Sequence, residues 1–202
     1  MTTLLLATHN QGKKREIENF LQDGILKIRL LSLADVNATD EVSESGATFA
    51  ENASLKADFY SQLTGLDTLG DDSGLEVIAL EGLPGVFSAR YAGVGAGDEA
   101  RIVKLLNEMK TVTDRRARFV SAVCISRGGR PLAAFNGKVE GEILFAKRGE
   151  GGFGYDPLFF YPPLGKTFAE LGLEVKNRIS HRARALAQVR NFILSGGMQT
   201  AG

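Results

Sequence analysis

The chain of 202 residues has no excess of charge of either sign and no long apolar run. Lys plus Arg and Asp plus Glu number 24 each, so no global positive field exists that would hold nucleic acid through its phosphates. No segment reaches the roughly 18 to 20 apolar residues of a membrane helix. The opening residues, MTTLLLATHN, lack the basic flank and the apolar length of a secretory signal. We therefore expect a cytoplasmic protein that binds neither nucleic acid nor a membrane.

Cysteine and linker sequences are equally scarce. The single cysteine, Cys124, cannot form an internal disulfide, which fits a reducing compartment. Its place in the apolar segment SAVCIS predicts a buried strand residue and not a nucleophile. No internal repeat, Pro/Ser-rich linker or low-complexity segment marks a boundary, so residues 1–202 are predicted to form a single domain. Only residues 195–202, which are rich in glycine, have the composition of a frayed tail.

Apolar periodicity predicts an α/β fold with a mixed sheet of long central strands flanked by helices. The expected order is a strand–helix–strand unit at the start, a long hairpin of two Val- and Phe-rich segments around Gly128 and Gly129 in the middle, and a closing helix. The expected strands are 4–7, 26–30, 118–126 and 131–145, and the expected helices are 13–21, 48–63, 98–109 and one that begins near Ser180.

Glycine is the one residue type in excess, with 24 of 202 residues or about 12%, against a usual ~7%. Several glycines lie in polar clusters, which predicts loops that approach a ligand closely. The first cluster, Thr8-His9-Asn10-Gln11-Gly12-Lys13, lies where a strand leads into a helix N-terminus, a position that favours an anion. It is no Walker A loop, because Ala7 and Lys14 occupy the required Gly and Ser/Thr positions. The alternative is a capped helix start with a solvated Lys13.

The second cluster is the tandem aspartate segment Asp71-Asp72-Ser73-Gly74, which we expect at a strand end or in a tight turn. Two adjacent carboxylates repel each other unless a cation relieves them, and Mg²⁺ prefers oxygen ligands. Glu44 is a third acidic residue that is able to complete such a site. The alternative is an Asp-rich turn without a ligand.

Two further clusters complete the pattern. In the segment 149–157, four glycines surround Phe153 and Tyr155, which predicts a surface on which a flat ring can stack. Between Lys176 and Arg182, cationic and imidazole groups gather at a helix N-terminus, where they need an external acceptor. A turn with buried aromatic residues and a solvated helix start are the respective alternatives. Together the four clusters fit a nucleoside triphosphate with a divalent ion.

The same residues resemble a known family, the inosine/xanthosine triphosphate pyrophosphatases, which hydrolyse deaminated purine nucleotides to the monophosphate and pyrophosphate. The resemblance extends in order over nearly the whole chain. It rests on ATHNQGK (7–13), GATFAENA (46–53), DDSGL (71–75), SARY (88–91), GFGYDP (152–157) and ISHR (179–182). One departure is His9, where relatives usually carry a small residue.

The resemblance implies two lobes with a substrate cleft between them, a homodimer and dependence on Mg²⁺. It implies that Asp72 is the proton acceptor and a metal ligand, with Glu44 as a second ligand. The residues implied in substrate binding are Thr8, His9, Asn10, Gln11, Gly12 and Lys13 with Lys56 for the phosphates, Ser73, and Phe153, Gly154, Tyr155, Asp156, Lys176, His181 and Arg182 for the nucleotide and base.

The sequence leaves four other functions as alternatives. A pyrophosphatase for modified pyrimidine nucleotides is disfavoured by the segment from Phe153 to Asp156. A non-catalytic nucleotide sensor leaves the tandem aspartates unexplained, and zero net charge disfavours a nucleic-acid-binding module. A kinase is disfavoured by the two failed Walker positions.

Overall fold

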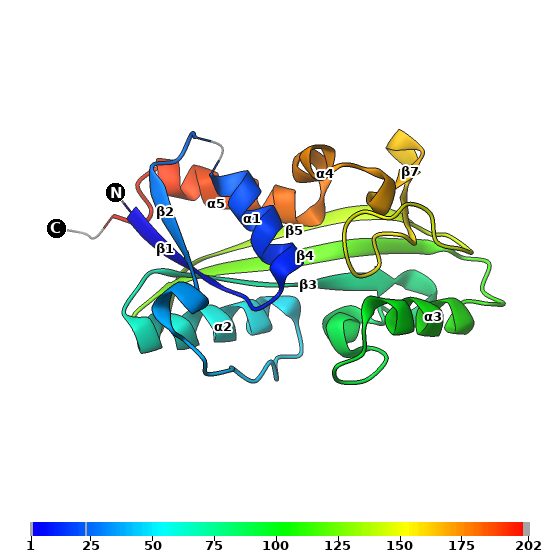
Figure 1. The fold of residues 1–202 in the computed structure, drawn as a ribbon, viewed down its shortest axis with the longest axis horizontal. Coiled ribbons are helices and arrows are strands. Elements are labelled where there is room, and N and C mark those ends of the chain that lie inside the picture. The colour runs from blue at the N-terminus through cyan, green and yellow to red at the C-terminus, as the bar shows by residue number, and fades with distance from the viewer. Residues whose placement is uncertain (1, 23, 200–202) are drawn as a thin grey trace. The chain divides into compact units, whose positions relative to one another are not determined.

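The computed structural model describes residues 2–22 and 24–199, and the chain divides into two compact units (Figure 1). Unit 1 consists of Met1–Asp72, Ser121–Gly137 and His181–Gly202, and unit 2 of Ser73–Val120 and Lys138–Ser180. Strands β3 (Thr68–Val77), β4 (Arg116–Arg127) and β5 (Arg130–Ile143) therefore contribute residues to both units.

The described residues form a seven-stranded sheet in the order β2-β1-β3-β4-β5-β6-β7. Strand β1 (Thr2–Ala7) runs parallel to β2 (Ile28–Ser32) and to β3. The short strands β6 (Phe159–Tyr161) and β7 (Lys166–Thr167) are antiparallel to their neighbours. The sheet is thus mixed, as predicted.

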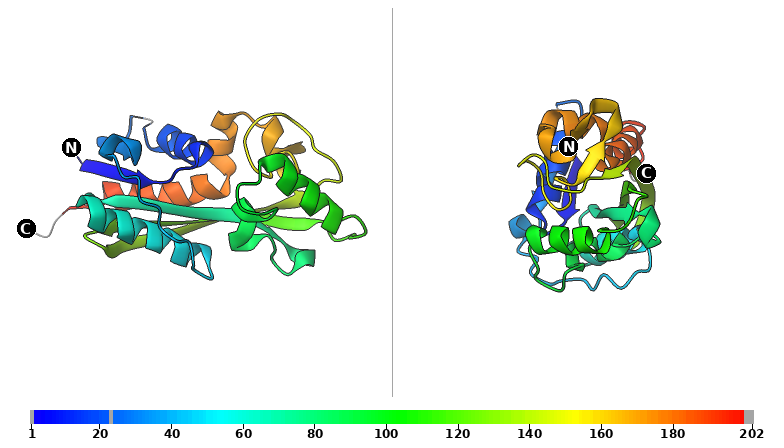
Figure 2. Two further views of the ribbon diagram at one scale, coloured as in Figure 1. Left: turned by 60° about the horizontal axis from the view of Figure 1, so that its bottom comes forward. Right: turned by 90° about the vertical axis from the view of Figure 1, so that its right-hand side faces the viewer.

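In unit 1, helices cover both faces of β1. Leu4 and Leu6 pack with residues of α1 (Gln11–Leu21) and α5 (His181–Leu194), whereas Leu5 and Ala7 pack on the side of Tyr60 in α2 (Phe49–Thr64). Alternate side chains of a strand point to opposite faces, so a continuous apolar strand requires apolar partners on both. Figure 2 shows α1 and α5 on one face and α2 on the other. The predicted α/β class is confirmed.

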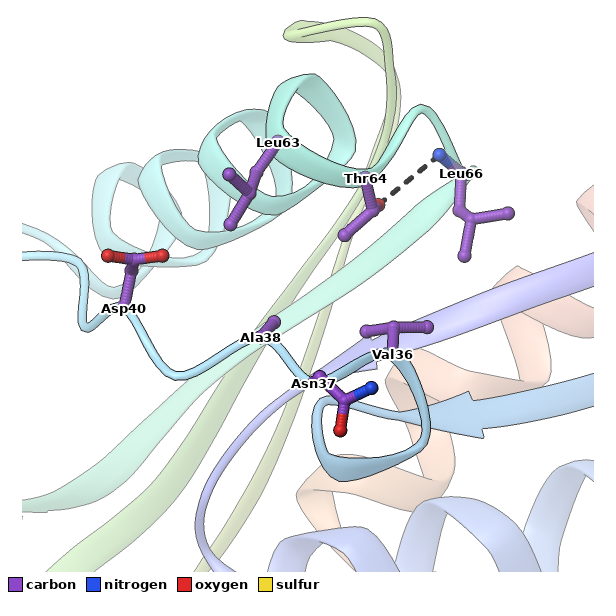
Figure 3. Close-up of a pocket in the computed structure, with 7 residues that line it drawn as sticks. All are labelled: Val36, Asn37, Ala38, Asp40, Leu63, Thr64 and Leu66. Atoms are coloured by element: carbon purple, nitrogen blue, oxygen red, sulfur yellow. Dashed lines mark hydrogen bonds between the residues drawn. The ribbon is translucent and has the colours of Figure 1, made fainter.

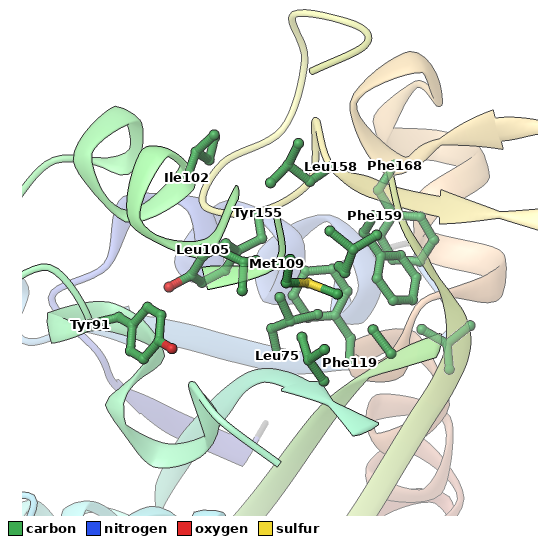
Figure 4. Packing of buried hydrophobic residues seen from close by; sticks show 14 of the residues in the cluster. Leu75, Tyr91, Ile102, Leu105, Met109, Phe119, Tyr155, Leu158, Phe159 and Phe168 are labelled. Atoms are coloured by element: carbon green, nitrogen blue, oxygen red, sulfur yellow. The ribbon is translucent and has the colours of Figure 1, made fainter. Parts of the chain in front are cut away.

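In unit 2, the core is aromatic. Helix α3 (Asp98–Glu108) packs Ile102 and Leu105 against a cluster that includes Phe119, Phe159 and Phe168 (Figure 4). The Phe119 and Phe159 ring centroids lie 4.5 Å apart and those of Phe159 and Phe168 4.9 Å apart, within the range of favourable aromatic pairs. This core supports the adjoining short helix α4 (Leu173–Ile179) through Ile179.

Most of the predicted elements are present within a few residues of their expected bounds. The hairpin turns at Gly128 and Gly129, whose φ angles of 55° and 77° suit a two-residue turn between twisted strands. Thr48 caps α2 by accepting a hydrogen bond from the backbone N–H of Glu51 at 3.2 Å, and Gly65 ends the helix with a φ of 69°. Cys124 is buried in β4, as its sequence context predicted.

The expected position of Asp71 and Asp72, at a strand end or in a tight turn, is wrong, because both residues lie inside β3, a ten-residue strand. Repulsion between the carboxylates does not break the strand, since basic side chains from other elements lie beside both of them. Two glycines also allow close packing here. A Cβ on Gly70 would lie 2.2 Å from the carbonyl oxygen of Ala53, and one on Gly74 would lie 2.3 Å from Oγ of Ser88.

Gly70→Ala is therefore expected to destabilise the protein strongly. The added methyl group meets backbone atoms of α2, which cannot rotate away, so α2 must shift relative to β3. Overpacking of this kind typically costs about 1 to 3 kcal/mol or more. Urea unfolding measures the change, and Gly97→Ala, which meets nothing within 4 Å, is the matched control. An unchanged midpoint for Gly70→Ala would contradict the close packing.

The chain beyond α5 folds back onto unit 1 as far as it is described. The backbone N–H of Gly197 donates to the carbonyl of Phe192 at 2.9 Å, and Met198 is buried in the cluster that contains Leu4. Residues 195–199 of the expected tail are thus part of the folded unit, and residues 200–202 lie outside the described residues. Within residues 2–22 and 24–199, no helix has the length and apolar character needed to cross a bilayer.

Candidate functional site

The loop between β1 and α1 presents a helix N-terminus, as its sequence predicted. Asn10 caps α1, because its Oδ1 accepts a hydrogen bond from the backbone N–H of Lys13 at 3.0 Å. Thr8 in turn accepts from the backbone N–H of Asn10 at 3.1 Å. His9 and Gln11 are exposed, and Nε2 of His9 lies 3.3 Å from the hydroxyl of Tyr60. The loop thus leads into the positive dipole end of α1, which favours an anion.

Lys13 is not a solvated side chain. Its Nζ lies 3.0 Å from Oδ1 of Asp71 and 3.6 Å from Oδ1 of Asp72, so α1 delivers one cation to both aspartates of β3. Its side chain keeps 13% of its surface exposed. Of the alternative prediction, the capped start of the helix is confirmed, whereas the solvated Lys13 is wrong.

Asp71 is a buried anion with several partners. Arg182 contacts it through Nε at 3.3 Å and Nη2 at 3.4 Å, and the hydroxyl of Ser121 donates to it at 2.8 Å. Burial alone would raise the pKa of Asp71, but the charges of Arg182, Lys13 and Lys56 outweigh it and hold the pKa well below the ordinary range. Asp71 is therefore a poor proton acceptor.

Asp72 has a different environment from its neighbour. The amide of Asn52 donates to its Oδ2 at 3.1 Å, and Nζ of Lys56 lies 3.6 Å from its Oδ1. The same Nζ lies 3.1 Å from Oε1 of Glu44. Helix α2 thus supplies an amide that orients Asp72 and an ammonium group that faces two carboxylates.

Glu44 and Asp72 have the chemistry of a partial magnesium site. Two carboxylates that share one ammonium group are hard oxygen donors directed at a common cation position. The described residues contain no group of three or more His, Cys, Asp or Glu side chains arranged for a metal. Mg²⁺ commonly takes one or two carboxylates and completes its shell with water and substrate phosphates, so the donor set fits this ion.

Unit 2 brings together three of the predicted base-binding residues. Nζ of Lys176 pairs with Oδ2 of Asp156, and both side chains are almost fully buried. The same Nζ lies 4.7 Å from the centroid of the Phe153 ring and 5.6 Å from that of Phe168, distances at which a cation–π attraction operates. The group therefore combines an aromatic face, a donor and an acceptor, which is what a heterocyclic base requires.

The glycine-rich segment beside this group is held by its own polar contacts. Oδ2 of Asp156 accepts from the backbone N–H of Phe153 at 2.9 Å. Gly152 has a φ of 74°, and a Cβ there would lie 2.1 Å from that carboxylate. The backbone N–H of Gly154 donates to Asp98 at 2.6 Å, and burial raises the pKa of Tyr155, whose hydroxyl donates to the carbonyl of Ser88. Tyr155 is thus part of the core.

The remaining predicted residues lie at the limits of the units. Ser73 is half-buried in β3 and is the first residue of unit 2. His181 and Arg182 begin α5 and are both buried. Arg182, which the resemblance places at the base, directs its guanidinium at Asp71 and Glu16 in the structure, because these two buried carboxylates require a counter-charge.

Three residues of this arrangement were missed in the sequence. Glu16, Asn52 and Ser121 contact Arg182, Asp72 and Asp71 respectively. For Glu16 a signal existed, because it lies one residue before the apolar Ile17 on a helix and three residues after Lys13. Nothing in the sequence marks Ser121, whose contact depends on the pairing of distant strands.

Unit 1 also contains a pocket of about 370 Å³ on the side of α2 (Figure 3). Asp40 supplies the charged group of its lining. The other lining residues are Val36, Asn37, Ala38, Leu63, Thr64 and Leu66. None of these is a predicted site residue, so the pocket is separate from the carboxylates of β3.

The chain matches known proteins over nearly its whole length. A model of the Ham1 family matches residues 4–192. A dITP/XTP pyrophosphatase of Thermus thermophilus is 53% identical over 185 residues, which cover 91% of this chain and 87% of the relative. One from Geobacter sulfurreducens is 50% identical over 195 residues, covering 96% and 97%. The solved structure of a HAM1 protein from Coxiella burnetii has a TM-score of 0.88 at 39% identity, covering 96% and 100%.

Proposed function

The chain belongs to the Ham1 family, and we propose that it is a nucleoside triphosphate pyrophosphatase that hydrolyses dITP, ITP and XTP to the monophosphate and pyrophosphate. The observation that carries the proposal is the arrangement around Asp72. Two lysines from different helices face this carboxylate, Lys13 at 3.6 Å and Lys56 at 3.6 Å, and Glu44 faces the second lysine.

Unit 1 supplies the residues proposed for the phosphate chain. The N-terminal end of α1, with its positive dipole end, binds phosphate oxygens, and Lys13 and Lys56 neutralise their charge. Both lysines already pair with carboxylates, so their ammonium groups are held near the carboxylates of β3 before the phosphates bind.

Glu44 and Asp72 are the residues that would hold Mg²⁺. When bound, the ion supplies Lewis-acid stabilisation of the charge that develops as the α–β phosphoanhydride bond breaks. Asp72 accepts the proton of the attacking water, and the amide of Asn52 fixes the orientation of its carboxylate at 3.1 Å. Asp71 does not compete for this role, because its oxygen atoms are occupied by Arg182, Ser121 and Lys13.

Unit 2 supplies the residues proposed for the base. A purine with an oxo group at position 6 offers an acceptor, whereas adenine offers an amino donor there. The ammonium group of Lys176 carries only donors and is almost fully buried, so the amino group of adenine would place a second donor against it where a 6-oxo group would accept a hydrogen bond. The Phe153 ring provides the stacking face. Sites with dedicated hydrogen-bonding groups discriminate by orders of magnitude, which matches the selectivity expected of a nucleotide-pool cleansing enzyme.

A nucleotide panel tests the proposal. Pyrophosphate release from dITP and XTP is expected to exceed release from dATP and dUTP by at least about 100-fold, and EDTA is expected to abolish it. Preference for dUTP would favour a pyrimidine-directed enzyme. Equal rates for all purines, or no pyrophosphate from any of them, would overturn the proposed function.

Two further properties follow from the family resemblance alone. We propose that the protein is a homodimer in the cytoplasm, with the nucleotide as its small-molecule partner. Sedimentation velocity at micromolar concentration measures the oligomeric state, and a monomer at all concentrations would contradict the first of these proposals.

A further inference from the structure

Seven charged side chains of unit 1 form a continuous row in which acid and base alternate. Each member lies within ion-pair distance of the next, from a buried pair at one end to the half-exposed Glu44 at the other. In order, the charge row consists of Glu16, Arg182, Asp71, Lys13, Asp72, Lys56 and Glu44.

The two ends of the charge row differ in exposure. Glu16, Arg182 and Asp71 are 4%, 1% and 1% exposed, so their geometry is fixed by the surrounding core. The side chain of Lys13 is 13% exposed and that of Glu44 is 36% exposed. An incoming anion therefore meets Lys13 first among the residues that contact Asp71, while Arg182 stays enclosed.

The difference in exposure indicates a role for Glu16 in holding Arg182 against Asp71. Lys13 and Arg182 both contact Asp71, and when phosphate draws Lys13 away, Arg182 still compensates its charge while Ser121 still donates a hydrogen bond to it. Arg182 can compensate Asp71 only if its guanidinium group is held in position. Glu16 holds it, because its carboxylate accepts a hydrogen bond from Nη1 of Arg182. Glu16 and Lys13 also lie three residues apart on one face of α1, so the Glu16–Arg182 pair fixes the rotation at which α1 presents Lys13.

We propose that Glu16 is a positioning residue which, through Arg182 and Asp71, sets the location of Lys13 for the phosphate chain. The inference rests on the proposed function and adds to it a residue that never touches the substrate. Displacement of a positioned group by about 1 Å is able to lower a rate by about 100-fold, so the effect is measurable even though Glu16 is remote from the reacting atoms.

Glu16→Gln is the test variant, and Glu18→Gln is the matched control. Glu18 lies on the same helix and forms a partly exposed ion pair, in which its Oε1 lies 3.7 Å from Nζ of Lys14. Its substitution is therefore expected to leave kcat/KM, triphosphate affinity and stability unaltered. For Glu16→Gln, kcat/KM for dITP is expected to fall about 10- to 100-fold. Its affinity for inorganic triphosphate with Mg²⁺, measured by calorimetry, is expected to fall about tenfold. Urea unfolding of each variant establishes the folded fraction.

A double-mutant cycle with Arg182→Gln separates positioning from simple stability. If Glu16 acts through Arg182, the double variant is no worse in kcat/KM than Arg182→Gln alone. Glu16→Asp keeps the charge at shorter reach and is expected to recover part of the loss, and it serves as the test variant if the Gln variant does not fold. The proposal would be overturned if the effects of Glu16→Gln and Arg182→Gln on kcat/KM multiply in the double variant. It would also be overturned by a folded Glu16→Gln variant with normal triphosphate affinity and normal kcat/KM. If the wild-type protein releases no pyrophosphate, the proposed function fails, and the calorimetric titration still decides the role of Glu16.

Discussion

Asp72→Asn is expected to lower kcat for dITP by about 10²- to 10⁴-fold, the usual contribution of a general base, while the protein stays folded. Asparagine has the same shape and keeps an oxygen that accepts the hydrogen bond from Asn52. It cannot take a proton from water, and it is a weaker ligand for Mg²⁺ than a carboxylate. The loss should therefore appear in turnover and in the Mg²⁺ concentration required, both measured by pyrophosphate release.

Asp67→Asn is the matched control for this variant. Asp67 directly precedes β3 and pairs with Arg127 at 2.6 Å, so its removal tests the loss of an aspartate near the same strand without touching Lys13 or Lys56. Its turnover should match that of the wild-type protein. Near-normal turnover of Asp72→Asn, at saturating Mg²⁺, would remove Asp72 from the chemical step and would shift attention to Glu44.

Lys176→Met is expected to destabilise unit 2 by about 3 to 5 kcal/mol, the usual cost of leaving one member of a buried ion pair alone. Asp156 would remain buried, with the backbone N–H of Phe153 as a donor in place of a cation. The cation–π contact with Phe153 would also be lost. Urea unfolding measures the change, and Lys166→Met, at an exposed lysine of β7, is the matched control.

A second variant separates the stability of this group from its proposed selectivity. In the double variant Lys176→Met with Asp156→Asn, both charges of this buried pair are removed, and the amide oxygen still accepts from the backbone N–H of Phe153. Stability is expected to return to within about 1.5 kcal/mol of the wild-type protein. The preference for dITP over dATP is expected to stay lost, because the buried donor is absent. Retained preference in the folded double variant would assign base selection to other residues.

Local sequence signals predicted most of the fold. The apolar run of β1, the capping Thr48 and the paired glycines of the hairpin each act within a few residues, so their consequences are readable without tertiary information. Strands β6 and β7 and helix α4 escaped prediction because they are short. Their order depends on the aromatic core around Phe159 and Phe168, which assembles residues from distant parts of the chain.

The candidate site shows where sequence reasoning stops. Two adjacent aspartates predict a turn only while their charges are considered alone. In the structure, Lys13, Lys56 and Arg182 arrive from three helices and make a buried strand compatible with both carboxylates. The helix position of Glu16 beside Ile17 was a signal that it could be buried, but its pairing with Arg182 depends on the packing of α1 against α5. Charge compensation is a property of the tertiary arrangement.

The way the chain alternates between its two units limits how the protein can be dissected. Unit 1 is assembled from three segments and unit 2 from two, so the backbone passes from one to the other four times. Two of these passages fall at Asp72–Ser73 and at Ser180–His181, next to residues proposed for substrate binding. No single gene fragment encodes either half, and a circular permutation cannot make them contiguous. Insertions at these two peptide bonds should inactivate the enzyme, whereas the turn at Gly128–Gly129 is the place to introduce a reporter.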